Sequence, residues 1–201
     1  MAGLFITLEG MDGAGKSTHI PTILQLLAQR GKEVVSTREP GGTLLGEELR
    51  EILLYRQMHV ETESLLMFAA RAEHLQQVIL PALQRGAIVL SDRFTDASYA
   101  YQCGARGLPY AKMEVLEHWV QGDLQPDVTL LFDVPVEVSL QRLASARTPD
   151  KFEAQGADFF AKLRAQYLAR AAQFPQRFHV IDANRPLEEV QKSVEEIILS
   201  L

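Results

Sequence analysis

The stretch Gly10-Met11-Asp12-Gly13-Ala14-Gly15-Lys16-Ser17 follows a short apolar run, Leu4 to Leu8, and opens a helical pattern over residues 16–29. It fits the spacing G-x-x-x-x-G-K-S/T in the strand-to-helix context that this spacing requires. Glycines let the backbone amides turn inward around a phosphate, and the helix directs its positive N-terminus at the same anion. The stretch therefore predicts a phosphate-binding loop after the first strand.

Residues 10–18 are the candidate contacts to the phosphates of ATP. The Lys16 ammonium adds a point charge, and the Ser17 hydroxyl offers a ligand to Mg²⁺. An ordinary glycine-rich turn capped by Ser17 is the alternative, but such a turn has no need of a lysine beside the cap. We therefore expect an ATP site with Mg²⁺ as cofactor, and we assign these contacts: Gly10, Met11, Asp12, Gly13, Ala14, Gly15, Lys16, Ser17 and Thr18.

Strand-like and helix-like segments alternate along the rest of the chain. Short apolar runs rich in β-formers predict strands at residues 4–8, 33–37, 87–91, 128–132 and 178–181. Helical patterns cover residues 16–29, 61–84, 136–145, 157–173 and 187–199. The alternation predicts one domain over residues 1–201, a P-loop NTPase three-layer α/β/α sandwich around a five-stranded parallel sheet. The polar stretch at residues 144–156 predicts a mobile lid.

Composition narrows the class of protein. With 201 residues, 47% of them hydrophobic, the chain can bury one core. A net charge of -6 argues against a surface that neutralises nucleic-acid phosphates. The single cysteine, Cys103, cannot form an intrachain disulfide, and neither a signal-peptide pattern nor an apolar run of membrane-spanning length is present. We expect a cytoplasmic protein without nucleic-acid or membrane partners.

Two further strands end in an acid, at Asp92 and Asp133. Either carboxylate could face the metal at the carboxyl edge of the sheet, and we assign Asp92 as the metal ligand beside Ser17. Arg93 directly follows Asp92, so a phosphate-binding guanidinium would lie next to the metal-side carboxylate. Solvated loop acids and a surface ion pair are the alternatives.

Two classes of P-loop protein compete: an enzyme that phosphorylates a small acceptor, and a nucleotide-dependent switch that signals through partners. A GTPase switch reads guanine with an N-K-x-D motif after a late strand. The only asparagine here, Asn184, is followed by Arg185-Pro186. The sequence therefore favours a kinase and leaves the switch as the alternative.

A kinase of this kind needs an acceptor surface and cations that close over the transferring group. Phe68 and Arg71, three apart in a helical pattern, could present a ring plane beside a guanidinium, although a core phenylalanine and a surface arginine is the simpler interpretation. Arg142, Arg147 and Lys151 place positive charge on or next to the predicted lid, and we assign Arg142 as a further contact to ATP. An ordinary solvated loop would look the same.

Four segments together resemble the bacterial thymidylate kinases, nucleoside monophosphate kinases with a P-loop. They are Gly10 to Thr18, Thr37-Arg38-Glu39-Pro40-Gly41-Gly42-Thr43, Leu66-Met67-Phe68-Ala69-Ala70-Arg71, and Asp92-Arg93-Phe94 followed by Ala100-Tyr101-Gln102. The likeness spans nearly the whole chain. It implies transfer of the γ-phosphoryl group of ATP to dTMP, giving dTDP, in a homodimer.

The resemblance also implies the acceptor contacts. Phe68 would stack on thymine, while Arg71 and Ser98 would hydrogen-bond its polar edge. Tyr101 would lie against the sugar where a 2'-hydroxyl would clash, and Gln102 would line the same pocket.

By the same resemblance Arg38 and Arg93 would hold the acceptor phosphate, and Asp12 would lie near the sugar 3'-hydroxyl and the metal. No catalytic base is required, because a phosphate monoester has a second pKa near 6 and is largely anionic at neutral pH. Positioned cations should then supply most of the catalysis. The catalytic assignments are Lys16, Arg93, Asp12, Arg147 and Lys151.

The sequence departs from the family pattern in the lid, which reads Arg147-Thr148-Pro149-Asp150-Lys151 and is slightly short. Relatives with an acidic P-loop typically carry arginines there, and lysine cannot form the bidentate contact of arginine. Which lid cation reaches the transferring group therefore stays open. Cys103 stands where relatives often place glycine, and we interpret it as a tolerated small residue.

Overall fold

The computed structural model describes residues 3–144 and 150–201. Its centre is a sheet of five parallel strands in the order β2-β3-β1-β4-β5. The strands are β1 (Leu4–Glu9), β2 (Val34–Arg38), β3 (Ile88–Asp92), β4 (Val128–Asp133) and β5 (Phe178–Asp182). The predicted five-stranded α/β fold is confirmed. Of the predicted lid, residues 144 and 150–156 are described, and Arg147 lies outside the described residues.

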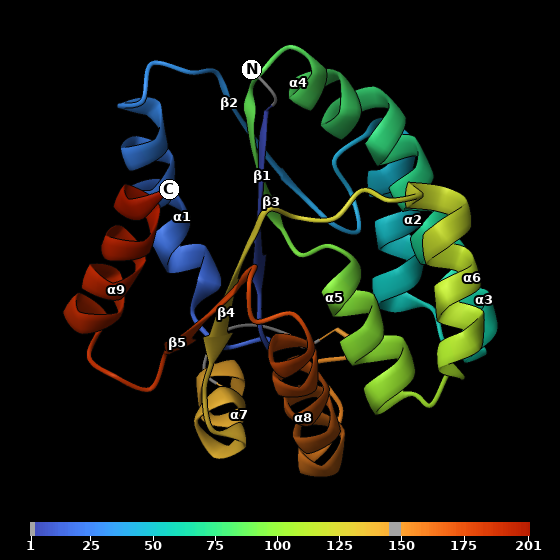
Figure 1. Ribbon diagram of the computed structural model, residues 1–201. Helices are drawn as coiled ribbons and strands as arrows, with labels where there is room; N and C mark the ends of the chain where they lie inside the picture. Colours follow the sequence, from blue (N-terminus) through green and yellow to red (C-terminus); the bar gives the residue numbers. More distant parts are fainter. Residues whose placement is uncertain (1–2, 145–149) are drawn as a thin grey trace.

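Helices cover both faces of the sheet (Figure 1). Helices α1 (Lys16–Ala28) and α9 (Leu187–Ser200) lie together on one side, and the helices between β2 and β4 lie on the other. That second group comprises α2 (Leu44–Tyr55), α3 (Val60–His74), η1 (Leu75–Ile79), α4 (Leu80–Gln84), α5 (Thr95–Ser98), η2 (Tyr99–Ala105) and α6 (Tyr110–Gln121). Helices α7 (Val136–Ala144) and α8 (Ala157–Gln173) complete the described elements. None of the described helices is both long enough and apolar enough to cross a membrane.

The helix predicted at residues 61–84 is not a continuous α-helix. It begins as α3, widens into the π-helix η1, and ends as α4 with Pro81 in its first turn. Proline has no N–H to donate to the preceding turn, and a wider turn accommodates that loss. Helix α2, which the periodicity did not indicate, begins where the Thr43 hydroxyl accepts a hydrogen bond from the Gly46 amide.

Alternation along the central strands fills a core on each face of the sheet. On β1, Ile6 and Leu8 pack into one apolar cluster, whereas Phe5 packs with Val89 into another. The strands run parallel, so Glu9, Asp92 and Asp133 end at the same edge of the sheet, with Leu8 paired in register with Asp92. The phosphate loop opens at this edge.

Candidate active site

The loop between β1 and α1 adopts the conformation that its glycines were expected to allow. Gly10, Gly13 and Gly15 have φ angles of 136°, 77° and 92°. A Cβ atom at Gly10 would lie 2.5 Å from the carbonyl oxygen of Phe132, so a larger residue would displace the loop. The Ser139 hydroxyl donates to the Asp12 carbonyl at 2.6 Å and fixes the loop to α7.

The Lys16 ammonium lies inside this loop. It is buried and donates to the carbonyl oxygens of Gly10 and Met11 at 3.1 and 3.2 Å. Burial lowers the pKa of Lys16, and the Arg93 charge lowers it further, while Asp92 and Asp12 act in the opposite direction. The geometry therefore places a cation where the loop would enclose a phosphate.

Asp12 connects the phosphate loop to two residues that follow β3. Its carboxylate pairs with Arg93 Nη2 at 2.5 Å and accepts a hydrogen bond from the Tyr101 hydroxyl at 2.5 Å. Burial raises the pKa of Asp12, but the charges of Arg93 and Lys16 outweigh burial, so the pKa lies below its ordinary value. Three residues predicted for the acceptor and the reaction thus meet in one cluster.

Arg93 is held in an unusual backbone conformation. Its φ is 73°, the left-handed region that few residues other than glycine occupy. In this conformation Nη1 donates to the Gly10 carbonyl and to the Tyr167 hydroxyl, each at 3.0 Å. The strain is compensated by contacts that aim the guanidinium at the mouth of the phosphate loop.

Beside this cluster lies a cavity of about 70 Å³, which we call the acceptor cavity. Its lining includes the predicted residues Asp12, Arg93, Tyr101 and Gln102. Sequence reasoning missed Arg50, a further cation on its wall from α2, which donates to the Pro40 carbonyl at 2.9 Å. The full lining is Asp12, Glu39, Pro40, Arg50, Leu53, Leu54, Met67, Arg93, Ala97, Tyr101, Gln102, Asp150 and Phe152.

Arg71 and Gln102 each keep one polar atom available near this cavity. Arg71 donates from Nε to Glu39 at 2.8 Å and from Nη2 to the Ser98 hydroxyl at 2.9 Å, while Gln102 donates to Glu63 at 3.0 Å. Within the part of the chain that the structure describes, buried Arg71 Nη1 and Gln102 Oε1 have no hydrogen-bond partner. Buried polar atoms rarely stay unpaired, so both indicate a ligand.

Phe68 occupies a different position from the one predicted for a base-stacking ring. The Arg71 guanidinium lies 4.5 Å from the centre of its ring, and the ring belongs to an apolar cluster with Tyr99 and Cys103. Phe68 is absent from the described lining of the acceptor cavity. Arg71, which packs on this ring, reaches the cavity wall only by its hydrogen bond to Glu39 among the described contacts.

A second hollow, of about 200 Å³, lies on the other side of the phosphate loop. Gly15 and Thr18 line it together with Ala183, which follows β5. The predicted contact Arg142 also lines it and donates to the carbonyls of Gly13 and Ala183 at 3.3 and 3.2 Å. The phosphate loop, Arg142 and the segment after β5 thus share one hollow.

Ser17 and Asp92, the predicted metal ligands, line a third hollow of about 500 Å³. Asp92 Oδ1 is buried and has no hydrogen-bond partner among residues 3–144 and 150–201, so it fits a cation ligand. Asp133 is instead held by Arg164 through two contacts of 2.7 and 2.8 Å. The described ranges contain no group of three or more His, Cys, Asp or Glu side chains that could hold a metal ion. Mg²⁺ does not require such a group, because one or two protein ligands suffice when phosphates and water supply the others.

Two predicted cations are paired with carboxylates of neighbouring helices. Arg38 shares the hollow of Ser17 and Asp92, where it pairs with Glu47 at 2.7 Å and is half-exposed. The Lys151 ammonium pairs with Glu63 of α3 at 2.7 Å. The sequence predicted that the Lys151 ammonium would lie at the transferring phosphoryl group. The structure instead places this ammonium at Glu63.

The sequence model of the family described as thymidylate kinase matches residues 8–194. The chain belongs to the thymidylate kinase family. It is 68% identical over 198 residues to a thymidylate kinase of Methylobacillus flagellatus, covering 98% of each chain. It is 61% identical over 203 residues to one of Cupriavidus taiwanensis, covering 100% of each chain. The crystal structure of a thymidylate kinase from Ehrlichia chaffeensis matches with a TM-score of 0.80 at 31% identity, covering 98% of this chain and 99% of that chain.

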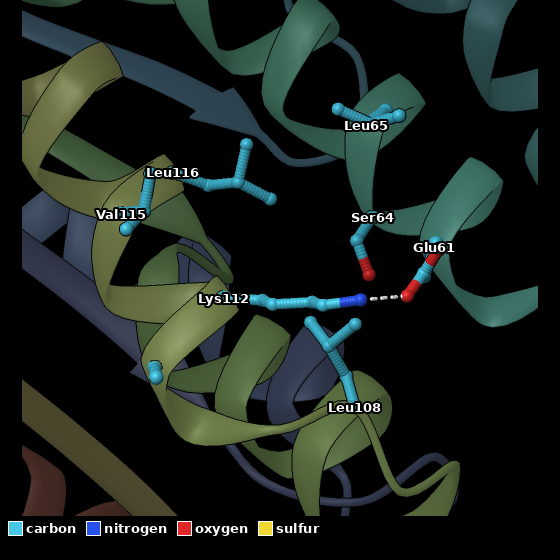
Figure 2. Close-up of a pocket in the computed structure, with 8 residues that line it drawn as sticks. Glu61, Ser64, Leu65, Leu108, Lys112, Val115 and Leu116 are labelled. Carbon is cyan, nitrogen blue, oxygen red and sulfur yellow. Dashed lines mark hydrogen bonds and ion pairs between the residues drawn. The ribbon is translucent and has the colours of Figure 1, made fainter.

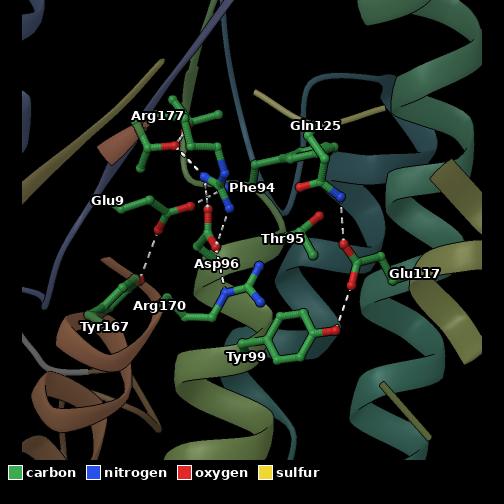
Figure 3. Close-up of polar contacts among 12 residues, drawn as sticks. Glu9, Phe94, Thr95, Asp96, Tyr99, Glu117, Gln125, Tyr167, Arg170 and Arg177 are labelled. Atoms are coloured by element: carbon green, nitrogen blue, oxygen red, sulfur yellow. Dashed lines mark hydrogen bonds and ion pairs between the residues drawn. The ribbon is translucent and has the colours of Figure 1, made fainter. Parts of the chain in front are cut away.

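In this member of the thymidylate kinase family, the buried carboxyl group of Glu9 holds two residues next to the active site. Glu9, the last residue of β1, accepts hydrogen bonds from the Phe94 amide at 2.8 Å and from the Tyr167 hydroxyl at 2.9 Å (Figure 3). The oxygen of Tyr167 in turn accepts from Arg93. Glu9 and Tyr167 were not predicted, because neither lies in a recognisable motif and they meet only in the folded chain.

Stability should depend on pH through Glu9. Burial and the nearby charge of Asp96 raise the pKa of Glu9 from 4.5 to about 8. The folded protein then keeps a proton that the unfolded chain releases, so the free energy of unfolding should fall as pH rises from about 5 to about 8, by a few kcal/mol (~1.4 per pKa unit). Glu9→Gln cannot ionise and should lack this fall in urea unfolding at pH 5, 6.5 and 8. Parallel curves for the two proteins would contradict the assignment.

Proposed function

We propose that this chain transfers the γ-phosphoryl group of ATP to dTMP and releases dTDP and ADP. The observation that carries the proposal is the pairing of a phosphate loop around Lys16 with a neighbouring acceptor cavity. Asp12 and Arg93 join the two. Family membership supports the same reaction.

The unpaired atoms near the cavity match thymine. Thymine presents the O4 acceptor beside the N3–H donor, which complement the Arg71 Nη1 donor and the Gln102 Oε1 acceptor. Cytosine presents an amino donor beside the N3 acceptor, which would leave both protein atoms unpaired. A site built on buried polar partners rejects such an analogue strongly. Uracil has the same polar edge as thymine, so these two atoms alone do not separate dTMP from dUMP.

Transfer requires the phosphate of dTMP and the phosphates of ATP, which are all anions, to approach each other. We assign cations to each of these two groups. Arg93 and Arg50 line the acceptor cavity and would hold the phosphate of dTMP. Lys16 would hold the donor phosphates, and Ser17 and Asp92 would hold Mg²⁺, which would neutralise phosphate charge. The acceptor phosphate is already largely anionic at neutral pH, so positioning and charge suffice without a base. A contact from Arg147 to the transferring group stays a prediction.

An ADP-release assay over a panel of acceptors tests the function. We expect turnover with dTMP and dUMP, much weaker turnover with dCMP, and almost none without an acceptor. A nucleotide-dependent switch would instead hydrolyse the nucleotide slowly at a rate that no acceptor changes. That outcome, or a preference for an acceptor that is not a nucleotide, would overturn the proposal.

Tyr101 should control the choice of sugar. Its hydroxyl donates to Asp12, and its ring packs edge-on against Phe152 with centres 5.4 Å apart. Tyr101→Phe removes the hydrogen bond that fixes the ring, so the preference for dTMP over its ribose counterpart should fall about tenfold. Competition between the two acceptors measures the ratio of kcat/KM values. An unchanged ratio would argue against a role in sugar selection.

We also propose a cytoplasmic homodimer formed through α3 and α6. Large apolar side chains on these helices are exposed: Leu65 by 56%, Val115 by 65% and Trp119 by 78%. Between the helices lies a mainly apolar hollow of about 360 Å³, where Lys112 and Glu61 form an ion pair (Figure 2). Such patches mark interfaces between proteins, and a two-fold axis would place this one against itself. Sedimentation velocity should give twice the monomer mass of 22.5 kDa.

A further inference from the structure

Glu63 is a buried carboxylate outside the phosphate-binding residues. It lies on α3, is 0% exposed, and is surrounded by three polar groups from other elements. Lys151 Nζ lies 2.7 Å from Oε2, Arg106 Nε lies 3.2 Å from Oε1, and Gln102 donates to Oε1 at 3.0 Å. A protein whose buried ion pair is replaced by hydrophobic residues is often at least as stable. Stability alone therefore does not explain why this ion pair is present.

The ion pair attaches one segment of chain to the helices that line the acceptor cavity. Lys151 is only 4% exposed in its side chain, and its ammonium also donates to the Arg56 carbonyl at 3.1 Å. Its backbone amide donates to the Leu54 carbonyl at 3.2 Å. Residues 150–156 are therefore fixed to the end of α2 and to α3 through Lys151.

This attachment places Phe152 in the wall of the acceptor cavity. The Lys151 ammonium lies 4.8 Å from the centre of the Phe152 ring, and that ring meets Tyr101 edge-on at 5.4 Å with an interplanar angle of 87°. Asp150 and Phe152 both line the cavity. The cavity encloses about 70 Å³, whereas small-molecule sites span roughly 300–1,000 Å³. The position of this wall therefore sets how much room the acceptor nucleotide has.

We propose that Glu63 is a positioning residue whose ion pair with Lys151 holds Phe152 in the cavity wall and so controls how tightly the acceptor nucleotide is retained. The inference rests on the proposed phosphorylation of dTMP. It gives Lys151 a different task from the one predicted from the sequence: the ammonium fixes the wall, and does not act on the transferring phosphoryl group. Gln102, which also contacts Glu63, extends the same contact to the base side of the cavity.

A double-mutant cycle tests the proposal with Glu63→Gln, Lys151→Met and the combination of both. Each single variant should raise the KM for dTMP about tenfold, leave the KM for ATP unchanged, and alter kcat less than about threefold. The double variant should be no worse than either single one, because both remove the same interaction. Lys151→Arg keeps the charge and should stay close to the unmodified enzyme. Hydrogen exchange of residues 150–156 should become faster in the two single variants and in the double variant.

A matched control is the exposed pair Glu33–Arg85, which has a similar 2.7 Å contact but belongs neither to α3 nor to residues 150–156. Glu33→Gln and Arg85→Met should leave all three kinetic constants unchanged. Lys151→Met leaves Glu63 paired with Arg106, so the test survives if Glu63→Gln does not fold. A fall in kcat at unchanged KM in Lys151→Met, additive with Glu63→Gln, would overturn the proposal, as would unchanged exchange in residues 150–156. Failure of the unmodified enzyme to phosphorylate dTMP would refute the proposed function separately, since exchange is measured without turnover.

Discussion

Lys16→Met is expected to lower kcat about a thousandfold, because it removes the one ammonium that the phosphate loop encloses. The methionine side chain fills a similar space, so the backbone of the loop should keep its shape. Burial already disfavours the charged form of Lys16, so the free energy of unfolding should not decrease. ADP release at saturating ATP and dTMP measures the loss, and urea unfolding measures the stability.

The control for this experiment is Lys192→Met, which removes an exposed lysine from α9 and should leave kcat unchanged. If Lys16→Met kept more than about a tenth of the turnover, phosphate binding by this loop would no longer explain the activity. A variant that had lost both turnover and stability would instead show that Lys16 holds the loop together.

Arg93→Gln is expected to lower kcat/KM for dTMP by about a hundredfold to a thousandfold. The guanidinium contacts Asp12 and the Gly10 carbonyl, so its loss removes acceptor charge and the link to the phosphate loop together. Arg93→Lys should recover only part of the activity, because an ammonium cannot make the two-pronged contact. Initial rates over a range of dTMP concentrations measure the change.

Arg164→Gln provides the comparison for Arg93, since Arg164 likewise pairs with a carboxylate at this edge of the sheet, that of Asp133, through two contacts. It should change kcat/KM less than about threefold. Equal losses in the two variants would mean that any arginine at this edge of the sheet supports the reaction, and the specific assignment of Arg93 would be wrong. A change confined to the KM for ATP would place Arg93 on the donor side.

The sequence was most informative where local pattern decides structure. Short apolar runs located all five strands to within one residue at each end, and the helix expected at residues 157–173 has those bounds. Contacts between segments that lie far apart in the sequence were harder to predict. Arg50 and Glu63 lie on helices whose periodicity does not reveal which polar side chain turns inward. Arg50 proved to line the acceptor cavity, and Glu63 proved to contact Gln102 of its lining.

The choice between Asp92 and Asp133 shows the same limit. Both residues end a strand, so position along the chain does not by itself decide which carboxylate faces the metal. Arg164, on α8, engages Asp133, and no described residue engages Asp92 Oδ1. Arg38 likewise looked suited to the acceptor phosphate, but Glu47 on α2, a helix that the periodicity did not indicate, pairs with it.

The π-helix η2 makes the length of one segment matter as much as its composition. At its C-terminal end the Arg106 amide reaches back five residues to the Tyr101 carbonyl, whereas an amide in an α-helix reaches back four. Deleting one residue between Tyr99 and Ala105 would let an α-helix run on and rotate everything beyond the gap by about 100° relative to Ser98. Protein engineers who trim or graft this segment should therefore conserve its residue count first and its side chains second.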